Sequence, residues 1–206
     1  MSVLLRLSTC STIGLRNENA SFGRLPARAP SRHRGFTMVE LMITLAVAVI
    51  LIAIAVPSFT YLIANNRLTT VANEMVDAVH TARMEAIKHN ANAQFCSNSS
   101  TNNTTDTLGT ACGTAGGAVA AMTATTAAQT RAAPSGLAAP IYLSGDLTAL
   151  RFNAQGIASA VGSSTSYSGK VAEICTTSMS TNNHLTINMT AGSVLVVAPP
   201  STGTCP

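Results

Sequence analysis

The chain has 206 residues, of which only 10% are charged and 4% aromatic, and it contains no Trp. This composition argues against a nucleic-acid-binding protein or a charge-rich cytosolic enzyme, and it is typical of an exported coat or filament protein. The length suffices for one modest globular domain with appended elements.

The positive charge is concentrated at the N-terminus. Residues 1–35 contain six arginines and one acid, Glu18, which gives a net charge of +5, whereas residues 36–206 contain six basic and seven acidic residues, which gives −1. The net charge of +4 therefore belongs to the first segment. If that segment is removed, the rest of the chain is close to neutral. The high isoelectric point of the whole chain therefore indicates nothing about the partners of the remaining protein.

Residues 36–63 form a strongly apolar segment, in which residues 41–56 carry no charge and one hydroxyl, that of Thr44. A membrane-spanning helix needs about 20 mostly apolar residues, and this segment reaches that length. The preceding arginines predict that the N-terminus lies in the cytoplasm. No small-residue signal-peptidase site follows the apolar run, so we expect the helix to be retained.

Glu40 stands at the edge of this apolar run, where an ionised carboxylate is costly unless it has a partner. One interpretation is an interfacial Glu at the level of the lipid headgroups. The other requires a cation at the same depth on a neighbouring chain. Cleavage before Phe36 would create such a cation, because it exposes a new α-amino group four residues from Glu40.

The residues around this position resemble the processing site of type IV pilins and type II secretion pseudopilins: Arg34-Gly35-Phe36-Thr37-Met38-Val39-Glu40-Leu41-Met42. The resemblance implies that prepilin peptidase removes a leader, residues 1–35, between Gly35 and Phe36 and methylates the Phe36 amine. It also implies that Glu40 pairs with that amine on an adjacent subunit, and that Pro57 bends the helix. This leader is longer than is usual in the family. Either the leader is extended, or the start codon has been placed too early.

Residues 64–91 continue the helix in amphipathic form, with apolar residues at three- and four-residue steps. No glycine lies between Gly35 and Gly109, and the helix is predicted to end near Asn90, with a length of about 80 Å at 1.5 Å per residue. Residues 82–90, Ala-Arg-Met-Glu-Ala-Ile-Lys-His-Asn, resemble the end of this helix in the GspH/FimT branch of the family.

Residues 92–206 are predicted to form a periplasmic or extracellular β domain, because short apolar or alternating runs are separated by Gly, Asn and Ser clusters. Residues 97–117 are predicted to form a polar loop, and residues 118–140 are left without an assignment. Residues 152–156 and 185–197 resemble the late strands of GspH/FimT proteins. The predicted fold is therefore α+β and pilin-like, with a long N-terminal helix packed on an antiparallel sheet. The predicted strands are residues 93–96, 141–143, 147–152, 157–161, 171–175, 185–189 and 194–197.

Five cysteines are present, and Cys10 lies in the basic segment. The other four are far from CxxC spacing, which indicates either two disulfides in an oxidising compartment or free buried thiols. Four cysteines allow three pairings. The pairing that closes the shortest loops joins Cys96 to Cys112 and Cys175 to Cys205, and it is the one we predict.

Neither catalysis nor metal or cofactor binding is expected, because the chain lacks the common catalytic and nucleotide-binding motifs. His80 and His89 would face opposite sides of one helix, and each histidine, His184 included, is best explained as a lone surface residue. Some FimT-type minor pilins bind DNA, but after Asn90 this chain has only three cations, and Ser193 stands where many relatives have Arg. The three cations are Arg131, Arg151 and Lys170.

The resemblance therefore implies a subunit that is anchored once in the inner membrane and then assembles with other pilins or pseudopilins into a filament. A minor type IV pilin is the preferred role, on the strength of the two predicted disulfides and the long Asn/Thr-rich loop. A type II secretion minor pseudopilin of the H type is the alternative, and a major pilin and a DNA-uptake pilin rank below it.

Overall fold

The structure is a computed structural model that describes residues 35–206, so the predicted leader lies outside the described residues except for Gly35. One helix, α1, spans Met38–His89. It begins after Thr37, whose side-chain oxygen accepts a hydrogen bond from the Glu40 N–H at 3.2 Å, as an N-cap residue does. It ends before Asn90, which adopts the left-handed conformation (φ 48°) common at helix C-termini.

The helix continues across Pro57, and its side chains differ in burial before and after residue 64. The large apolar side chains before that point are exposed. From Ala64 onward a stripe of apolar residues at three- and four-residue spacing is buried. Its members are Ala64, Leu68, Val71, Ala72, Met75, Ala78, Val79, Ala82 and Ala86.

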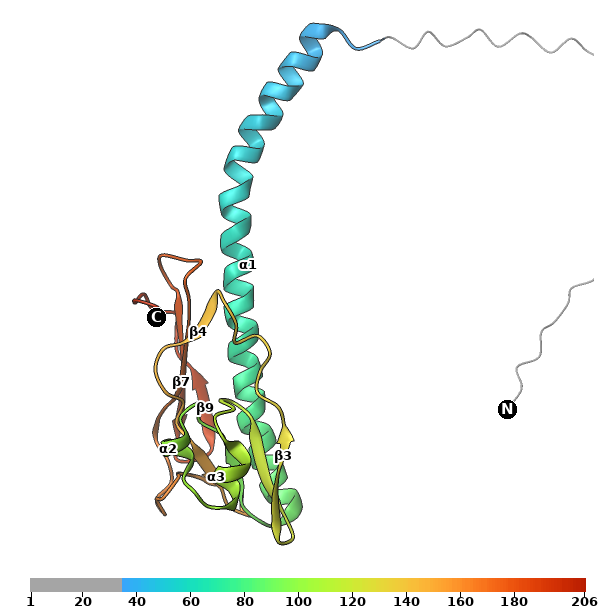
Figure 1. Ribbon diagram of the computed structural model, residues 1–206. Helices are drawn as coiled ribbons and strands as arrows, with labels where there is room; N and C mark the ends of the chain where they lie inside the picture. The colour runs from blue at the N-terminus through green and yellow to red at the C-terminus, as the bar shows by residue number, and fades with distance from the viewer. Residues whose placement is uncertain (1–34) are drawn as a thin grey trace, which may run out of the picture. The chain divides into compact units, whose positions relative to one another are not determined.

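The nine strands found among the described residues form two antiparallel sheets beside the C-terminal half of α1 (Figure 1). The five-stranded sheet has the order β3-β2-β1-β5-β6, and the four-stranded sheet has the order β4-β7-β8-β9. The bounds are β1 Ala93–Phe95, β2 Val119–Thr123, β3 Thr126–Arg131, β4 Ile141–Leu143, β5 Leu150–Phe152, β6 Ala158–Ala160, β7 Gly169–Thr176, β8 His184–Thr190 and β9 Val194–Val197.

A single apolar core joins both sheets to the buried stripe of α1. Phe95 and Phe152 fill it from the first sheet, and Ile174 and Ile187 fill it from the second; all four are at most 1% exposed. Burial of this much apolar surface is the main force that holds the sheets on the helix. The arrangement confirms the predicted class, an α+β fold with a long helix packed on antiparallel sheet.

Two regions differ from the sequence prediction. Residues 118–140, left unassigned, contain the hairpin of β2 and β3, whose turn places Ala124 at a φ of 58°. Its strands are rich in Ala, which is depleted in strands, and its turn has no glycine, so the usual hairpin signals are missing. Residues 97–117, predicted as a loop, contain two short helices, α2 Ser100–Asn103 and α3 Thr107–Cys112.

Candidate membrane and assembly surface

The N-terminal end of α1 presents the residues of the predicted processing site to solvent. The Phe36 side chain is 76% exposed, and a Cβ added to Gly35 would have no neighbour within 4 Å. Glu40 lies exposed in the first turn of the helix, where the helix dipole favours a carboxylate. Within the described chain its carboxylate forms no ion pair, so it is accessible to a cation from another molecule.

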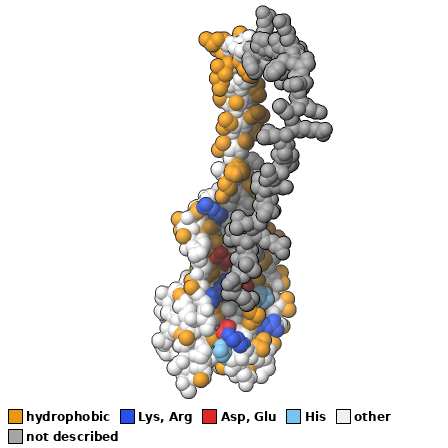
Figure 2. All heavy atoms as spheres, turned by 90° about the vertical axis from the view of Figure 1, so that its right-hand side faces the viewer, with side chains coloured by type: hydrophobic (Ala, Val, Ile, Leu, Met, Phe, Trp, Pro, Cys, Tyr) orange, Lys and Arg blue, Asp and Glu red, His pale blue; other side chains and the backbone are white. Residues whose placement is uncertain are grey.

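The helix is apolar around its whole circumference as far as Ile63. Its exposed large side chains include Leu45, Ile50, Leu51 and Phe59, each at least 58% exposed. Figure 2 shows hydrophobic side chains distributed over this exposed part of the helix. A helix that is apolar on all sides needs an apolar environment. Within residues 35–206, α1 is the one helix long and apolar enough to cross a membrane.

Two disulfides are present in the β domain, and they join the pairs with the shortest loops. Cys96 is bonded to Cys112 with a Cα–Cα distance of 5.4 Å, and Cys175 to Cys205 at 5.7 Å. The first closes the segment with α2 and α3 against the end of β1. The second ties the C-terminal tail to β7. Both distances lie in the usual range for disulfides.

The three cations that follow the helix are all occupied by carboxylates. Arg131 pairs with Asp77, Arg151 with Asp106 at 2.6 Å, and Lys170 with Glu173 at 2.8 Å. Phosphate recognition by a protein surface needs several free, converging cations. Among residues 91–206 each of these cations already has a carboxylate partner.

Two of these carboxylates have altered pKa values. Burial works to raise the pKa of Asp106, but hydrogen bonds from Arg151 and from the Gly109 N–H outweigh it, and the pKa lies below its usual value. The hydrogen bond from Lys170 is the main reason that the pKa of Glu173 is also lowered. The folded domain therefore favours the charged form of both carboxylates.

The prediction for His184 was wrong, because its side chain is buried and not at the surface. Its Nδ1 lies 2.8 Å from Oε1 of Glu173, and its backbone N–H and C=O bond to Ser201. His184 thus helps to hold the tail. His80 is exposed and His89 lies 3.2 Å from Glu85. Among the described residues no group of three or more His, Cys, Asp or Glu could hold a metal ion.

An apolar N-terminal helix, an exposed carboxylate in its first turn and a disulfide-linked β domain define a membrane-anchored, prepilin-like protein. Residues 30–56 match the prokaryotic N-terminal methylation motif, and residues 71–192 match the type II transport protein GspH. The second match covers more than half of the chain, and the chain belongs to the GspH family of type IV pilin-like proteins.

This family is structural and non-enzymatic. The methylation motif implies processing by a peptidase, anchoring in a membrane before assembly, and pilin-like assembly partners. Searches of curated proteins and of solved structures found no significant match.

Proposed function

We propose that this chain is a minor type IV pilin, cut between Gly35 and Phe36, methylated at the new amine and inserted into a pilus through Glu40. The proposal depends chiefly on one observation: an exposed carboxylate, unpaired within residues 35–206, stands four residues after Phe36 and next to a strongly apolar helix surface. In an apolar environment such a carboxylate requires a cation, and a neighbouring subunit's Phe36 amine supplies one.

Before assembly the protein would cross the inner membrane once, with its β domain in the periplasm. The two disulfides support this location, because disulfides persist in oxidising compartments. In the filament, residues 36–63 would form the apolar contact with other subunits. Residues 64–91 would support the β domain, residues 92–206, at the filament surface. Pro57 is proposed to bend the helix.

A type II secretion minor pseudopilin of the H type is the second candidate, favoured by the description of the matching family. The disulfide-closed segment with α2 and α3, rich in Asn and Thr, favours the pilus. Deletion of the gene distinguishes the two. We expect sheared cell-surface fractions to lose pili while the secreted proteins in the medium are unchanged. Loss of secretion with intact pili would instead assign the chain to the pseudopilus.

Glu40→Ala tests the assembly role within either system. The variant should still be cleaved and remain in the membrane, because its apolar helix is unchanged, but it should be absent from purified filaments. Asp146→Ala is a matched control, since it also removes an exposed carboxylate but lies in the β domain. Normal incorporation of Glu40→Ala would contradict the charge-pair proposal.

A further inference from the structure

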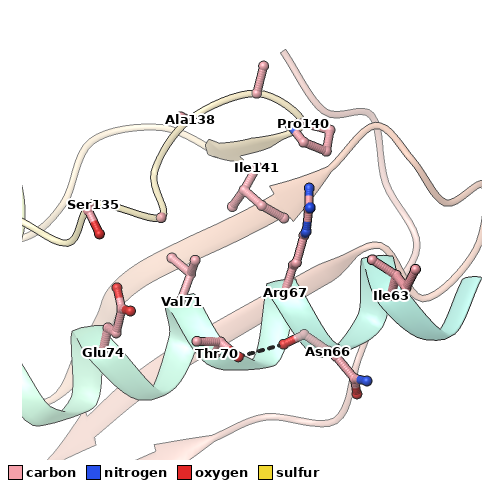
Figure 3. A pocket seen from close by; sticks show the side chains of 12 residues that line it. Ile63, Asn66, Arg67, Thr70, Val71, Glu74, Ser135, Ala138, Pro140 and Ile141 are labelled. Carbon is pink, nitrogen blue, oxygen red and sulfur yellow. Dashed lines mark hydrogen bonds between the residues drawn. The ribbon is translucent and has the colours of Figure 1, made fainter. Parts of the chain in front are cut away.

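A groove lies between α1 and residues 135–141, close to the end of the apolar part of the helix. It has a volume of about 480 Å³, and its walls include Arg67, Val71, Glu74 and Ile141 (Figure 3). A smaller hollow of about 210 Å³ shares Ile63, Arg67 and Pro140 with it and extends to Thr60. The groove therefore continues down to the level at which the apolar surface begins.

Arg67 and Glu74 give this groove one cation and one anion. They are seven residues apart, which places them on the same face of α1 about 10.5 Å apart along its axis. Within residues 35–206 neither side chain forms an ion pair. Arg131 lies beside Glu74, but its guanidinium donates a hydrogen bond to the Glu74 backbone carbonyl and pairs with the Asp77 carboxylate.

One carboxylate oxygen of Glu74, Oε2, is buried in the groove wall and has no hydrogen-bond partner among the residues that the structure describes. A buried, unpaired carboxylate oxygen is costly, and rotation of the carboxylate toward the groove would let a ligand donor remove that cost. Figure 3 shows the Arg67 and Glu74 side chains rising from α1 toward residues 135–141, with Val71 between them. Along α1 the groove thus offers first a cation, then an apolar wall and then a hydrogen-bond acceptor.

The position of this groove along the helix matches the lipid headgroups. Residues 41–63 are 23 residues long, or about 34 Å at 1.5 Å per residue, which is enough to cover a hydrocarbon core of about 30 Å. Arg67 lies four residues beyond, about 6 Å further along, and so falls in the headgroup layer. Tyr61, which is 42% exposed, stands where aromatic residues anchor membrane helices.

We propose that this groove binds a zwitterionic phospholipid whose headgroup carries a primary ammonium. Arg67 binds the phosphate, for which a guanidinium is well suited, and Glu74 accepts hydrogen bonds from the ammonium group. Ile63 and Pro140 contact the glycerol and the start of the acyl chains. The bound lipid holds the β domain against the membrane in the unassembled protein.

A second copy of the chain is the rival occupant. The part of its helix that is free of its own β domain, residues 45–63, is apolar but carries no charge. It would cover the apolar wall and leave Arg67 and Glu74 unpaired. Charge complementarity therefore favours the phospholipid.

Native mass spectrometry of the full-length protein, extracted in a mild detergent, tests the proposal. The protein is titrated with phosphatidylethanolamine, phosphatidylcholine and phosphatidylglycerol that have identical acyl chains. We expect phosphatidylethanolamine to be retained on the order of tenfold more strongly than the other two, because only it brings both a phosphate and a donating ammonium. Equal retention of all three lipids would overturn the proposal.

Two substitutions separate the charges. Glu74→Gln should lower phosphatidylethanolamine retention to that of phosphatidylglycerol, while Arg67→Gln should weaken all three lipids. The controls Asp146→Asn and Lys88→Gln make the same charge changes outside the groove and should have no effect. If a control variant lowers retention as much as its groove counterpart, the effect is general electrostatics and the proposal fails.

Thr70→Phe fills the groove from the exposed side of α1 without changing a charge, and it should also lower phosphatidylethanolamine retention while the thermal unfolding temperature stays unchanged. The spectra resolve monomer from dimer. A dimer that forms without lipid and is lost in Thr70→Phe would assign the groove to a second copy and overturn the proposal. Lipid binding rests only on the part of the proposed function that anchors the chain in a membrane. A negative result would therefore reject the lipid proposal and leave the proposed role in the filament unchanged.

Discussion

Removal of the disulfide between Cys175 and Cys205 should destabilise the β domain mainly through the unfolded chain. The two residues are separated by 30 positions. The chain-entropy relation for a loop of this length gives a loss of about 3.6 kcal/mol at 25 °C when both cysteines are changed to Ala. This is a large part of the 5–15 kcal/mol by which typical domains of about this size are stable.

The folded tail should stay in place in this variant. The backbone of Ser201 exchanges two hydrogen bonds with His184, at 2.9 and 3.0 Å, and the Asn183 side chain bonds to the Gly203 carbonyl at 2.9 Å and to its N–H at 3.1 Å. These contacts do not depend on the disulfide. The lost stability therefore comes from the greater freedom of the unfolded chain, and the unfolding midpoint should shift to lower denaturant.

Pulse proteolysis of the full-length protein in mild detergent, over a series of urea concentrations, measures the unfolding free energy. Reduction of a Cys96→Ala/Cys112→Ala variant, in which Cys175–Cys205 is the remaining disulfide of the β domain, should cause the same loss as the change of Cys175 and Cys205 to Ala. For comparison, the same relation gives about 3.1 kcal/mol for Cys96–Cys112, which are 16 positions apart. A loss below about 1 kcal/mol for Cys175–Cys205 would refute the reasoning, because this is far below the loop-closure term.

Two further outcomes are expected in the same assay. Gly192→Ala should lower the unfolding free energy more than Gly145→Ala does. Both glycines have positive φ, but only at Gly192 would the new Cβ lie 2.5 Å from a carbonyl oxygen, that of Ala158. Equal losses of unfolding free energy would contradict this prediction. The difference in unfolding free energy between wild type and Glu173→Gln should be constant above about pH 5. It should shrink as the pH falls through the lowered pKa of Glu173, because protonation of the carboxylate removes its bond to Lys170. A difference that persists at about pH 2 would contradict this prediction.

The sequence predicted the helix and most of the strands because their signals are local. The apolar stripe of α1 follows the 3.6-residue period without a glycine to interrupt it, and the residues of that stripe are buried as expected. The hairpin of β2 and β3 was missed because its strands are rich in Ala, which is depleted in strands, and because its turn has no glycine. It is stabilised by pairing with β1, in a register such as Ala93 opposite Ala121, which local sequence does not reveal.

The burial of His184 and the groove at Arg67 depend on contacts between distant segments. His184 meets Glu173 because β7 and β8 pair with Cys175 opposite His184, a register that its own neighbours in sequence do not specify. The seven-residue spacing of Arg67 and Glu74 was visible in the sequence. The groove that they share also needs residues 135–141, which are distant in sequence and pack over the same face of α1.

The most direct test of the account is the N-terminus of the protein isolated from its native membrane. Intact-mass and peptide mass spectrometry should find a chain that begins at Phe36 with a methylated α-amino group, since that amine is the cation proposed for Glu40 of the next subunit. A membrane-embedded protein that still carries residues 1–35 would contradict the account, because the Glu40 carboxylate of a neighbouring subunit would then have no Phe36 amine to pair with.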